Sequence, residues 1–434
     1  MSLLEHPQAQ DLLADAVVTA AAVRHCQQHL TEFLQRYLPL FYRQEQRDLA
    51  ALVLRGRLSG LERKTSEPIA HQAGRHRKPV QHFVGQGAWD DEAVMAELRH
   101  HVAEELGDPE AVLVLDGSGF PKKGMESCGV ARQWCGRLGK VENCQVGVFL
   151  SYAAPGGHAP LDRRLVLTRD WAADRKRRRK AHVPPEVVFQ ETWRIALDLL
   201  DRSGPDVPHG WVAGDDEFGR ATDFRAQLRL RQERYVLDVP ADTLVREVAR
   251  RPDGKRPAFE RAEVWAARQP AWRWKTITVR AGAKGPLKVR ALKRRAQTKE
   301  GGGHVGPAET LIVIRSPGPE PRTWYTVSNA ARRERLATLV KVHGERHRVE
   351  EVLQEGKGEV GLAHYEVRSW VGWHHHMTLA LLALWFVARE RRRLGGKNAG
   401  RDAAASAADL QPAAARAAPR AGADRRAGQP RAAA

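Results

Sequence analysis

The sequence predicts an α/β fold with a helical N-terminal region and a β-rich insertion, and three observations lead to it. Residues 1–105 show helical periodicity of their apolar side chains. Short apolar runs that end in an aspartate follow, with helical segments between them. Helical patterning then returns after a stretch rich in strand-forming residues. With 434 residues, 42% of them hydrophobic, the chain can form one large domain or two to three smaller ones.

The N-terminal region, 1–105, has apolar residues at steps of three and four, as in Leu30, Phe33, Leu34, Tyr37 and Leu38. Basic side chains separate its helical stretches at Arg75–Lys78. This combination suits a small helical DNA-binding module, and a solvated basic face explains it equally well.

The central segment, 106–239, is predicted to contain both strands and helices. Its opening strand, Ala111–Asp116, ends in a carboxylate followed by Gly117, the pattern of a buried strand that meets a loop. A second strand with the same ending is Trp211–Asp215. The other predicted elements are strands at 145–152, 163–168 and 235–239 and helices at 185–203 and 221–234.

Three further segments follow. Residues 240–335 are predicted to be a β-rich insertion, because four strand-like runs are separated by Gly and Pro turns. Residues 336–388 are predicted to be helical. Residues 389–434 consist largely of Ala, Arg, Gly and Pro without an apolar period, which predicts a basic, disordered tail.

The charge of the chain is strongly positive, with a formal net charge of +19 and a sequence pI of about 10.2. Such a balance favours nucleic acid as a partner over an anionic membrane surface, although Arg-heavy coding in a GC-rich genome also raises the pI. The chain lacks a secretory signal and any apolar run of roughly 18 residues. Its four cysteines form neither a disulfide framework nor a zinc-binding spacing. A cytoplasmic location is expected.

Two strands that each end in an aspartate, followed by a helix that carries a glutamate, can bring three carboxylates together. Phosphoryl transfer to water or to a 3′-hydroxyl requires divalent ions that stabilise both the attacking and the leaving oxygens. Hard ions such as Mg²⁺ are held by one or two carboxylates each. Each acidic residue alone is weak evidence, since an Asp at a strand end often only caps a turn.

Four long strings resemble the bacterial insertion-sequence transposases of the seven-oh-one branch, which carry a DDE active site: 115–124, 129–149, 213–219 and 349–370. The likeness extends more weakly from about 63 to 388. The catalytic domain of that family is RNase H-like, so the resemblance implies an RNase H-like mixed sheet flanked by helices. It also implies that 106–239 form the first part of this catalytic domain and 336–388 its helical second part. The insertion at 240–335 resembles one in transposases that form hairpin intermediates.

The resemblance also implies an acidic triad, which we place position by position. Asp116 follows the first strand and precedes Gly-Ser-Gly-Phe-Pro-Lys-Lys-Gly. Asp215, rather than Asp216, stands four residues before the glycine of an Asp-x-x-aromatic-Gly pattern. The catalytic and metal-binding set predicted in this way is Asp116, Asp215 and Glu350.

The third member is placed by a signature of the related transposases. In this signature two residues separate a Tyr from an Arg, three separate the Arg from a Glu, and six separate the Glu from a Lys. Arg346, Glu350 and Lys357 fit this spacing, which favours Glu350 over Glu351 and over Glu366, its remaining competitor. His343 stands where the signature has Tyr, which leaves the role of that position in doubt. The steps of four and seven place the three matching residues on one helix face, where they could instead form a surface ion-pair ladder.

Several cations are predicted to contact DNA phosphates. They are Lys122, Lys123, Arg346 and Lys357, although the first two could simply keep a loop soluble. The six consecutive cations of 175–180 could follow a DNA backbone or form a mobile, non-specific run. His374–His376 is interpreted as a polar cluster near a helix start rather than a metal site.

The function expected from the resemblance is that of an insertion-sequence transposase. It would use Mg²⁺, with Mn²⁺ as a substitute, to cleave a DNA strand and transfer the 3′-hydroxyl end to target DNA. Its partners would be terminal inverted repeats, target DNA and further copies of itself in the synaptic complex, in association with the nucleoid. The alternative is a transposase-derived DNA-binding protein without transposition activity. A general RNase H-like nuclease is a third possibility.

Overall fold

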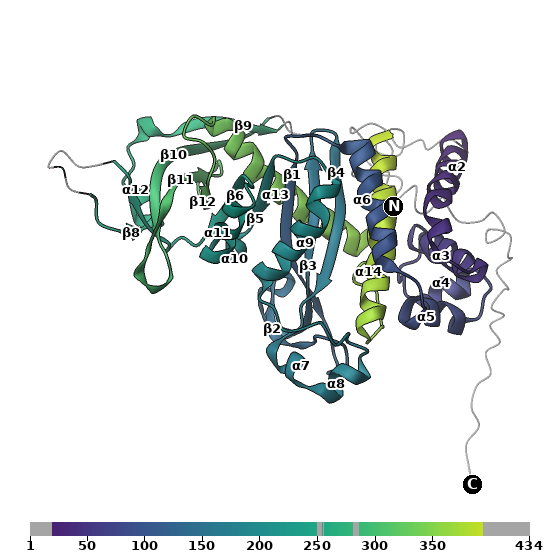
Figure 1. The fold of residues 1–434 in the computed structure, drawn as a ribbon. Helices are drawn as coiled ribbons and strands as arrows, with labels where there is room; N and C mark the ends of the chain where they lie inside the picture. Colours follow the sequence, from purple (N-terminus) through teal and green to yellow (C-terminus); the bar gives the residue numbers. More distant parts are fainter. Residues whose placement is uncertain (1–19, 250–253, 255, 281–285, 394–434) are drawn as a thin grey trace, which may run out of the picture.

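A computed structural model describes residues 20–249, 254, 256–280 and 286–393 of the chain. A long mixed sheet runs through the molecule, with helices against the part built from β1, β3, β4, β5 and β6 (Figure 1). The mixed sheet flanked by helices confirms the predicted α/β class and is consistent with an RNase H-like fold.

Within the described residues, five α-helices precede the first strand. They are α2 (Ala20–Tyr37), α3 (Gln44–Arg57), α4 (Ser66–Gln72), α5 (Arg77–Gln86) and α6 (Asp91–Leu106). The side chain of Asp90 accepts hydrogen bonds from the amides of Glu92 and Ala93 and so caps the start of α6. Helices α2–α5 gather on the outer side of α14 (Trp370–Arg393), the last described helix (Figure 1).

The central sheet has the strand order β4-β3-β1-β5-β6. Strand β1 pairs antiparallel with β3 and parallel with β5, and β5 pairs parallel with β6. The elements of this segment are β1 (Val112–Pro121), β2 (Ala131–Cys135), β3 (Lys140–Ala154), β4 (Gly157–Leu165), α7 (Arg169–Ala173), α8 (Arg175–Lys180), α9 (Thr192–Ser203), β5 (Trp211–Gly214), α10 (Asp216–Gly219), α11 (Thr222–Leu230) and β6 (Tyr235–Val239).

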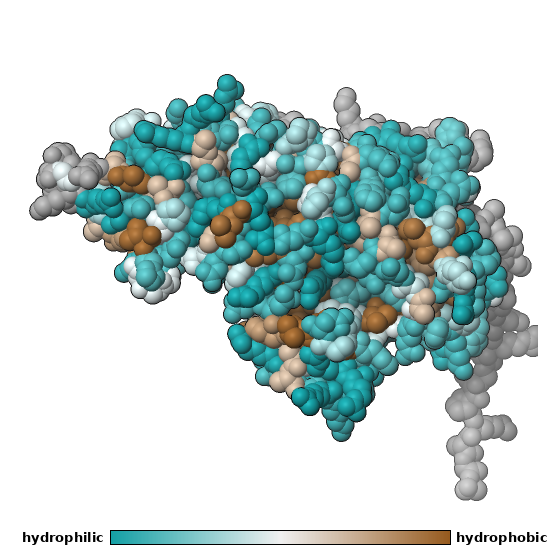
Figure 2. Space-filling view, viewed as in Figure 1, coloured by the Kyte–Doolittle hydropathy of each residue, from teal (hydrophilic) through white to brown (hydrophobic). Residues whose placement is uncertain are grey.

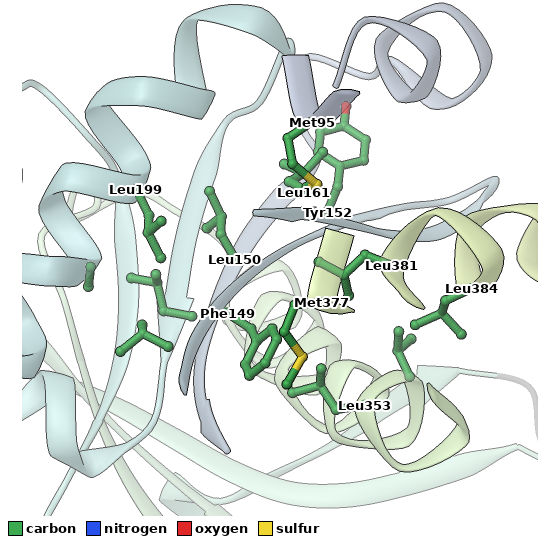
Figure 3. Packing of buried hydrophobic residues seen from close by; sticks show 14 of the residues in the cluster. Met95, Phe149, Leu150, Tyr152, Leu161, Leu199, Leu353, Met377, Leu381 and Leu384 are labelled. Carbon is green, nitrogen blue, oxygen red and sulfur yellow. The ribbon is translucent and has the colours of Figure 1, made fainter. Parts of the chain in front are cut away.

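The two faces of this sheet bury different helices, because successive side chains of a strand point in opposite directions. Val112 and Val114 of β1 belong to a buried cluster with Leu339 of α13 (Leu336–Glu359). Figure 3 shows the same division on β3, where Phe149 faces Met377 and Leu353 and its neighbour Leu150 points towards Leu199. Asp116, two residues beyond Val114, therefore lies on the face that α13 covers.

The segment after β6 is largely β-structure. It holds β7 (Leu244–Glu247), β8 (Glu260–Arg261), α12 (Ala262–Ala267), β9 (Lys275–Arg280), β10 (Leu287–Lys299), β11 (Val305–Arg315) and β12 (Thr323–Ser328). Strand β12 pairs antiparallel with β6, so these strands extend the central sheet. Helix α13 then begins at Leu336, where the sequence predicts that helices resume.

Some predicted boundaries were wrong. Strand β1 does not stop at Asp116 but continues to Pro121, because the Gly-Ser-Gly that follows pairs in register with β3. Strand β4 ends at Leu165, before the predicted end at 168. The helix predicted over 185–203 begins only at Thr192, because Val183 and Val187 enter the core from an irregular segment.

The end of α14 corrects the predicted start of the tail. The helix continues to Arg393, and its last turns are held by ion pairs of Arg389 with Glu105 (2.6 Å) and Arg391 with Glu355 (2.7 Å). The rest of the predicted tail, 394–434, lies outside the described residues. No described helix is long and apolar enough to cross a membrane. The face in Figure 2 is mostly hydrophilic, with small separate apolar patches.

Candidate active site

Asp116 and Asp215 come from neighbouring parallel strands. Leu115 of β1 pairs with Gly214 of β5, so the next residue on each strand is one of the two aspartates. Adjacent strands lie about 4.8 Å apart. Asp215 directly follows its strand and caps α10, because its carboxylate accepts a hydrogen bond from the amide of Glu217 (3.0 Å). Both side chains are half-buried.

The charges around these aspartates identify a single electrostatic cluster. Burial raises the pKa of Asp116 to about 7, and the carboxylates of Asp215 and Glu350 add to the rise, while Arg346 and Lys357 oppose it. Burial likewise raises the pKa of Asp215 to about 6, helped by Glu217 and opposed by Arg346. The structure thus brings the predicted triad together with two of the predicted cations.

Glu350 reaches this cluster from α13. Its carboxylate accepts a hydrogen bond of 2.7 Å from Nη1 of Arg346, one helical turn earlier. The Glu350 side chain is 49% exposed, whereas that of Arg346 is 9% exposed. The guanidinium of Arg346 is therefore held inside the protein rather than displayed on its surface. The side chain of the rejected neighbour Glu351 lies outside the described residues.

Asp238 is a site residue that the sequence reasoning missed. It lies in β6, and its carboxylate is 3.2 Å from Nε of Arg346 and 3.1 Å from Nε2 of His343. It also accepts a hydrogen bond of 2.9 Å from the hydroxyl of Thr326. Burial alone would raise the pKa of Asp238, but His343 and Arg346 hold it below its usual range. The available signal was an aspartate inside an otherwise apolar strand, Tyr235–Val239.

This network gives His343 a structural explanation. The family signature has Tyr at this position. Here the imidazole of His343 contacts the carboxylate of Asp238, which also binds Arg346, and lies edge-on to Trp324 with ring centroids 5.8 Å apart. Asp238 therefore fixes two residues of α13, His343 and Arg346. Through Arg346 it also orients Glu350.

Gly219 explains why the Asp-x-x-aromatic-Gly pattern ends in glycine. A Cβ at this position would lie 1.8 Å from the carbonyl oxygen of Asp238. The lack of a side chain therefore lets α10 approach β6, which sets Asp215 beside the Asp238 network. Glu217, another residue without a predicted role, lies close by, since its Oε2 is 3.5 Å from where a Cβ on Gly117 would be.

The remaining predicted DNA contacts occupy different places. Lys357 lies near Asp116, and its ammonium is 5.6 Å from the centre of the Phe120 ring. Lys122 follows the end of β1, about 20 Å from Asp116 at 3.3 Å per strand residue. Its ammonium lies 3.3 Å from the centre of the Tyr365 ring. Lys123 is exposed. Only Lys357 and Arg346 thus belong to the carboxylate cluster.

Glu366, the competitor of Glu350, lies elsewhere. It forms an exposed ion pair of 2.8 Å with Arg63, and its charge acts on Lys122 rather than on Asp116. The run 175–180 forms the short helix α8, in which Arg178 donates hydrogen bonds to backbone carbonyls while Arg175 is exposed.

The three consecutive histidines lie near the start of α14, as predicted, and are buried there. His374 contacts the carbonyl of Trp370 (3.0 Å), and His375 stacks on Trp89 with ring centroids 3.8 Å apart. Nδ1 of His376 lies 2.8 Å from Nη2 of Arg57. Burial lowers the pKa of each of these histidines. They are packing residues of the core.

The donor chemistry of the cluster fits a hard divalent ion. Among the described residues, no group of three or more His, Cys, Asp or Glu side chains lies close enough together to hold a metal ion in this arrangement. Asp116, Asp215 and Glu350 nevertheless offer the oxygen ligands that Mg²⁺ takes, in a place where their mutual repulsion favours a cation. Zinc-type ligands are not part of the cluster.

The sheet topology is consistent with the RNase H-like fold class. Residues 36–298, more than half of the chain, match the family described as DDE superfamily endonuclease. The protein belongs to this family.

Among curated proteins, the probable transposase for insertion sequence element IS701 of Microchaete diplosiphon is 33% identical over 94 residues. The match covers 21% of this chain and 25% of the relative. The chain thus spans about a quarter of the length of the curated relative that it matches. The resemblance to insertion-sequence transposases is confirmed at the level of the family.

Proposed function

We propose that the protein is an insertion-sequence transposase that cleaves DNA strands and transfers the resulting 3′-hydroxyl ends to target DNA. The observation that carries the proposal is the meeting of Asp116, Asp215 and Glu350 on the face of the sheet that α13 covers. Membership of the DDE endonuclease family supports the nuclease chemistry. The match to a probable IS701 transposase supports the mobile-element role.

In this proposal Asp116, Asp215 and Glu350 hold Mg²⁺, with Mn²⁺ as a substitute. When bound, the divalent ions stabilise the charge that develops on the attacking and leaving oxygens of phosphoryl transfer. The two aspartates must lose their protons to serve as ligands, which their raised pKa values make dependent on pH. Arg346 is a positioning residue, since it holds Glu350 in place and is itself held by Asp238.

The proposed reaction has two steps at one site. A water molecule attacks a phosphodiester, the P–O3′ bond breaks, and the strands end in a 5′-phosphate and a 3′-hydroxyl. That hydroxyl then attacks a phosphodiester of the target, so that one P–O bond forms as another breaks. Lys357, beside Asp116, is placed to attract a phosphate to the carboxylates. We propose Lys122 and Lys123 as contacts farther along the DNA.

The decisive experiment incubates the purified chain with DNA that carries the ends of its own element, with Mg²⁺, with Mn²⁺ and with EDTA. Strand cuts should appear only with metal and only at the element ends. Asp116→Asn should abolish cutting and keep DNA binding. Cutting that ignores the terminal repeats would indicate a general nuclease. Binding without any cutting by the unaltered chain would indicate a DNA-binding protein of transposase ancestry.

A further inference from the structure

A second, separate feature is a cleft between the N-terminal helices and the segment that precedes α14. It has a volume of about 650 Å³. Helices α3, α4 and α5 form one wall, the segment 364–369 forms another, and the end of α8 closes one side. Figure 1 shows α8 and α5 at the same end of the molecule. Its polar and charged lining includes Arg57, Lys64, Lys180, His182, Glu366 and Arg368.

Two cations in this lining are buried without a carboxylate. Arg57 is 2% exposed and donates hydrogen bonds to the carbonyl of Val360 (3.0 Å), and its Nε has no hydrogen-bond partner. Lys64 is 5% exposed and donates to the carbonyls of Arg57 (2.8 Å) and Ser59 (2.7 Å). Across the described ranges, no carboxylate lies within ion-pair distance of either residue.

The cost of this buried positive charge is visible in both groups. Burial lowers the pKa of Arg57 to about 9 and that of Lys64 to about 8, and the carboxylate of Glu359 offsets only part of the effect on Lys64. Backbone carbonyls satisfy the hydrogen atoms of these side chains but do not neutralise their charge. An anion in the cleft would supply the missing compensation.

The rim of the cleft adds further positive charge. Lys180 and Arg368 are both exposed. The acidic lining residues are Glu126, which pairs with Lys180, and Glu366, which pairs with Arg63 from outside the lining. Four cations therefore face two carboxylates before any histidine is protonated.

His182, another lining residue, has a backbone φ of 52°, in the left-handed region that L residues rarely adopt. Its side chain is exposed. This conformation ends α8, because the amides of His182 and Val183 donate hydrogen bonds to the carbonyls of Arg179 and Arg178. The turn places the exposed side chain of His182 at the rim of the cleft.

A continuous line of residues joins the cleft to the carboxylate cluster. Tyr365 lines the cleft, and its ring packs against Phe120 with centroids 5.8 Å apart. Lys122 lies over Tyr365, and Lys357 lies over Phe120 and beside Asp116. The path follows β1 for about 20 Å. Consecutive phosphates of a DNA strand rise by about 3.4 Å along the axis, so this corresponds to about six nucleotides.

The lining also indicates the class of ligand. Pockets for small organic molecules are mostly apolar with a few polar groups, whereas this cleft is lined mainly by Lys, Arg, His, Gln, Ser and Thr side chains. These are the groups that contact DNA phosphates and sugars without reading sequence. The two cations Lys122 and Lys357, which lie between the cleft and Asp116, fit a polymer with repeated charges better than a free ion.

We infer that the cleft between α3–α5 and residues 364–369 binds the sugar-phosphate backbone of a DNA strand, about six nucleotides from the phosphate that lies at the carboxylates. The inference rests on the proposed function, because it takes DNA as the substrate. It adds a contact that joins the N-terminal helices to the catalytic domain through one strand.

A binding assay in EDTA tests this inference separately from cleavage. The probe is a fluorescein-labelled 30-base-pair duplex of arbitrary sequence, since backbone contacts do not depend on sequence. Arg368→Gln should lower the slope of log K against log salt by about 0.9 and weaken binding about eightfold at 0.1 M salt. Arg231→Gln, which removes the same charge from the end of α11, outside the cleft lining, is the control and should leave the slope nearly unchanged.

Cross-linking tests the position. All four native cysteines are buried, so Arg368→Cys provides the reactive thiol and the unaltered chain gives the background. A duplex that carries a bromoacetamide group on one phosphate should cross-link to Arg368→Cys, and excess unlabelled duplex should prevent it. In parallel, the rate at which a neutral maleimide modifies the thiol of Arg368→Cys is measured in the presence of inorganic phosphate and in the presence of duplex, at equal ionic strength.

The outcomes separate three conclusions. A reduced slope together with a cross-link supports the backbone site. Equal slopes for Arg368→Gln and Arg231→Gln, without a cross-link, overturn it. Protection from maleimide by inorganic phosphate but not by duplex shows a small-anion site and also overturns it. If the nuclease proposal fails, metal-dependent cutting will be absent. The binding measured in EDTA does not depend on cutting, so it still tests the backbone site.

Discussion

Replacing the carboxyl of Asp116 by an amide should stabilise the protein when no divalent metal is present. In the folded chain, the pKa of Asp116 rises from its ordinary value of 3.8 to about 7, because the carboxyl group is buried and lies near the carboxylates of Asp215 and Glu350. The folded state therefore binds this proton more tightly than the unfolded state does. Folding stability consequently falls as pH rises from about 4 to about 7, because the native protein must carry an unfavourable charge.

The size of the effect follows from the pKa. A rise from 3.8 to about 7 corresponds to about 4 kcal/mol of native-state destabilisation above pH 7. Water that reaches the half-buried carboxyl screens part of the repulsion, so we expect about 2–4 kcal/mol. Asp116→Asn should gain this amount at pH 8 and almost nothing at pH 4, where the native carboxyl is already protonated.

Urea denaturation in EDTA at pH 4.5, 6 and 8 measures the effect, and Asp242→Asn, the same change on an exposed loop residue, is the control. Added Mn²⁺ at pH 8 should then stabilise the unaltered chain but not Asp116→Asn, since a ligand stabilises only the state that binds it. The reasoning is refuted if the stability difference between Asp116→Asn and the unaltered chain is the same at every pH.

Three further outcomes are expected. Binding of Mn²⁺, measured by calorimetry, should weaken as pH falls below about 7 and further below about 6, because Asp116 and Asp215 must both lose their protons to bind metal; an affinity that is constant down to pH 5 would contradict this. Arg346→Ala should cost about 3 kcal/mol in urea at pH 7, the lower end of the range for a broken buried pair, since it leaves Asp238 charged and buried with His343 and Thr326 as its remaining partners. Because the pKa of Asp238 is held below its usual range, stability from the pair is present above pH 4 and lost below it, so an equal cost at pH 3 would count against the pairing. Gly219→Ala should destabilise the fold by about 1–3 kcal/mol through its contact with Asp238, whereas Gly358→Ala, whose Cβ meets no atom within 4 Å, should be neutral or slightly stabilising.

The order of elements and two of the proposed ligands could be read from local patterns. Apolar runs located β1, β5 and β6, and the return of helical spacing located the start of α13 at Leu336. The continuation of β1 beyond Asp116 could not be read, because Gly-Ser-Gly is a turn signal in isolation. It becomes a strand only when β3 supplies the hydrogen-bonding partner.

The environment of the candidate site was predictable only in part. The spacing of Arg346, Glu350 and Lys357 predicted a shared helix face, and the structure places all three near Asp116. The spacing could not show that Arg346 is buried against Asp238, 108 residues earlier in the sequence. Such a contact depends on how α13 packs on the sheet, which no local pattern encodes.

What the sequence alone determined is the fold class, the order of strands and helices and the family resemblance, since these follow from periodicity and from strings of neighbouring residues. Only the tertiary structure decided that Asp116 lies within a strand, that Asp238 anchors Arg346, and that Glu350 rather than Glu366 lies near the aspartates. The cleft with its two uncompensated cations also belongs to the tertiary structure. The physical reason is that pKa values, burial and ion pairing depend on side chains that are distant in the chain and close in space.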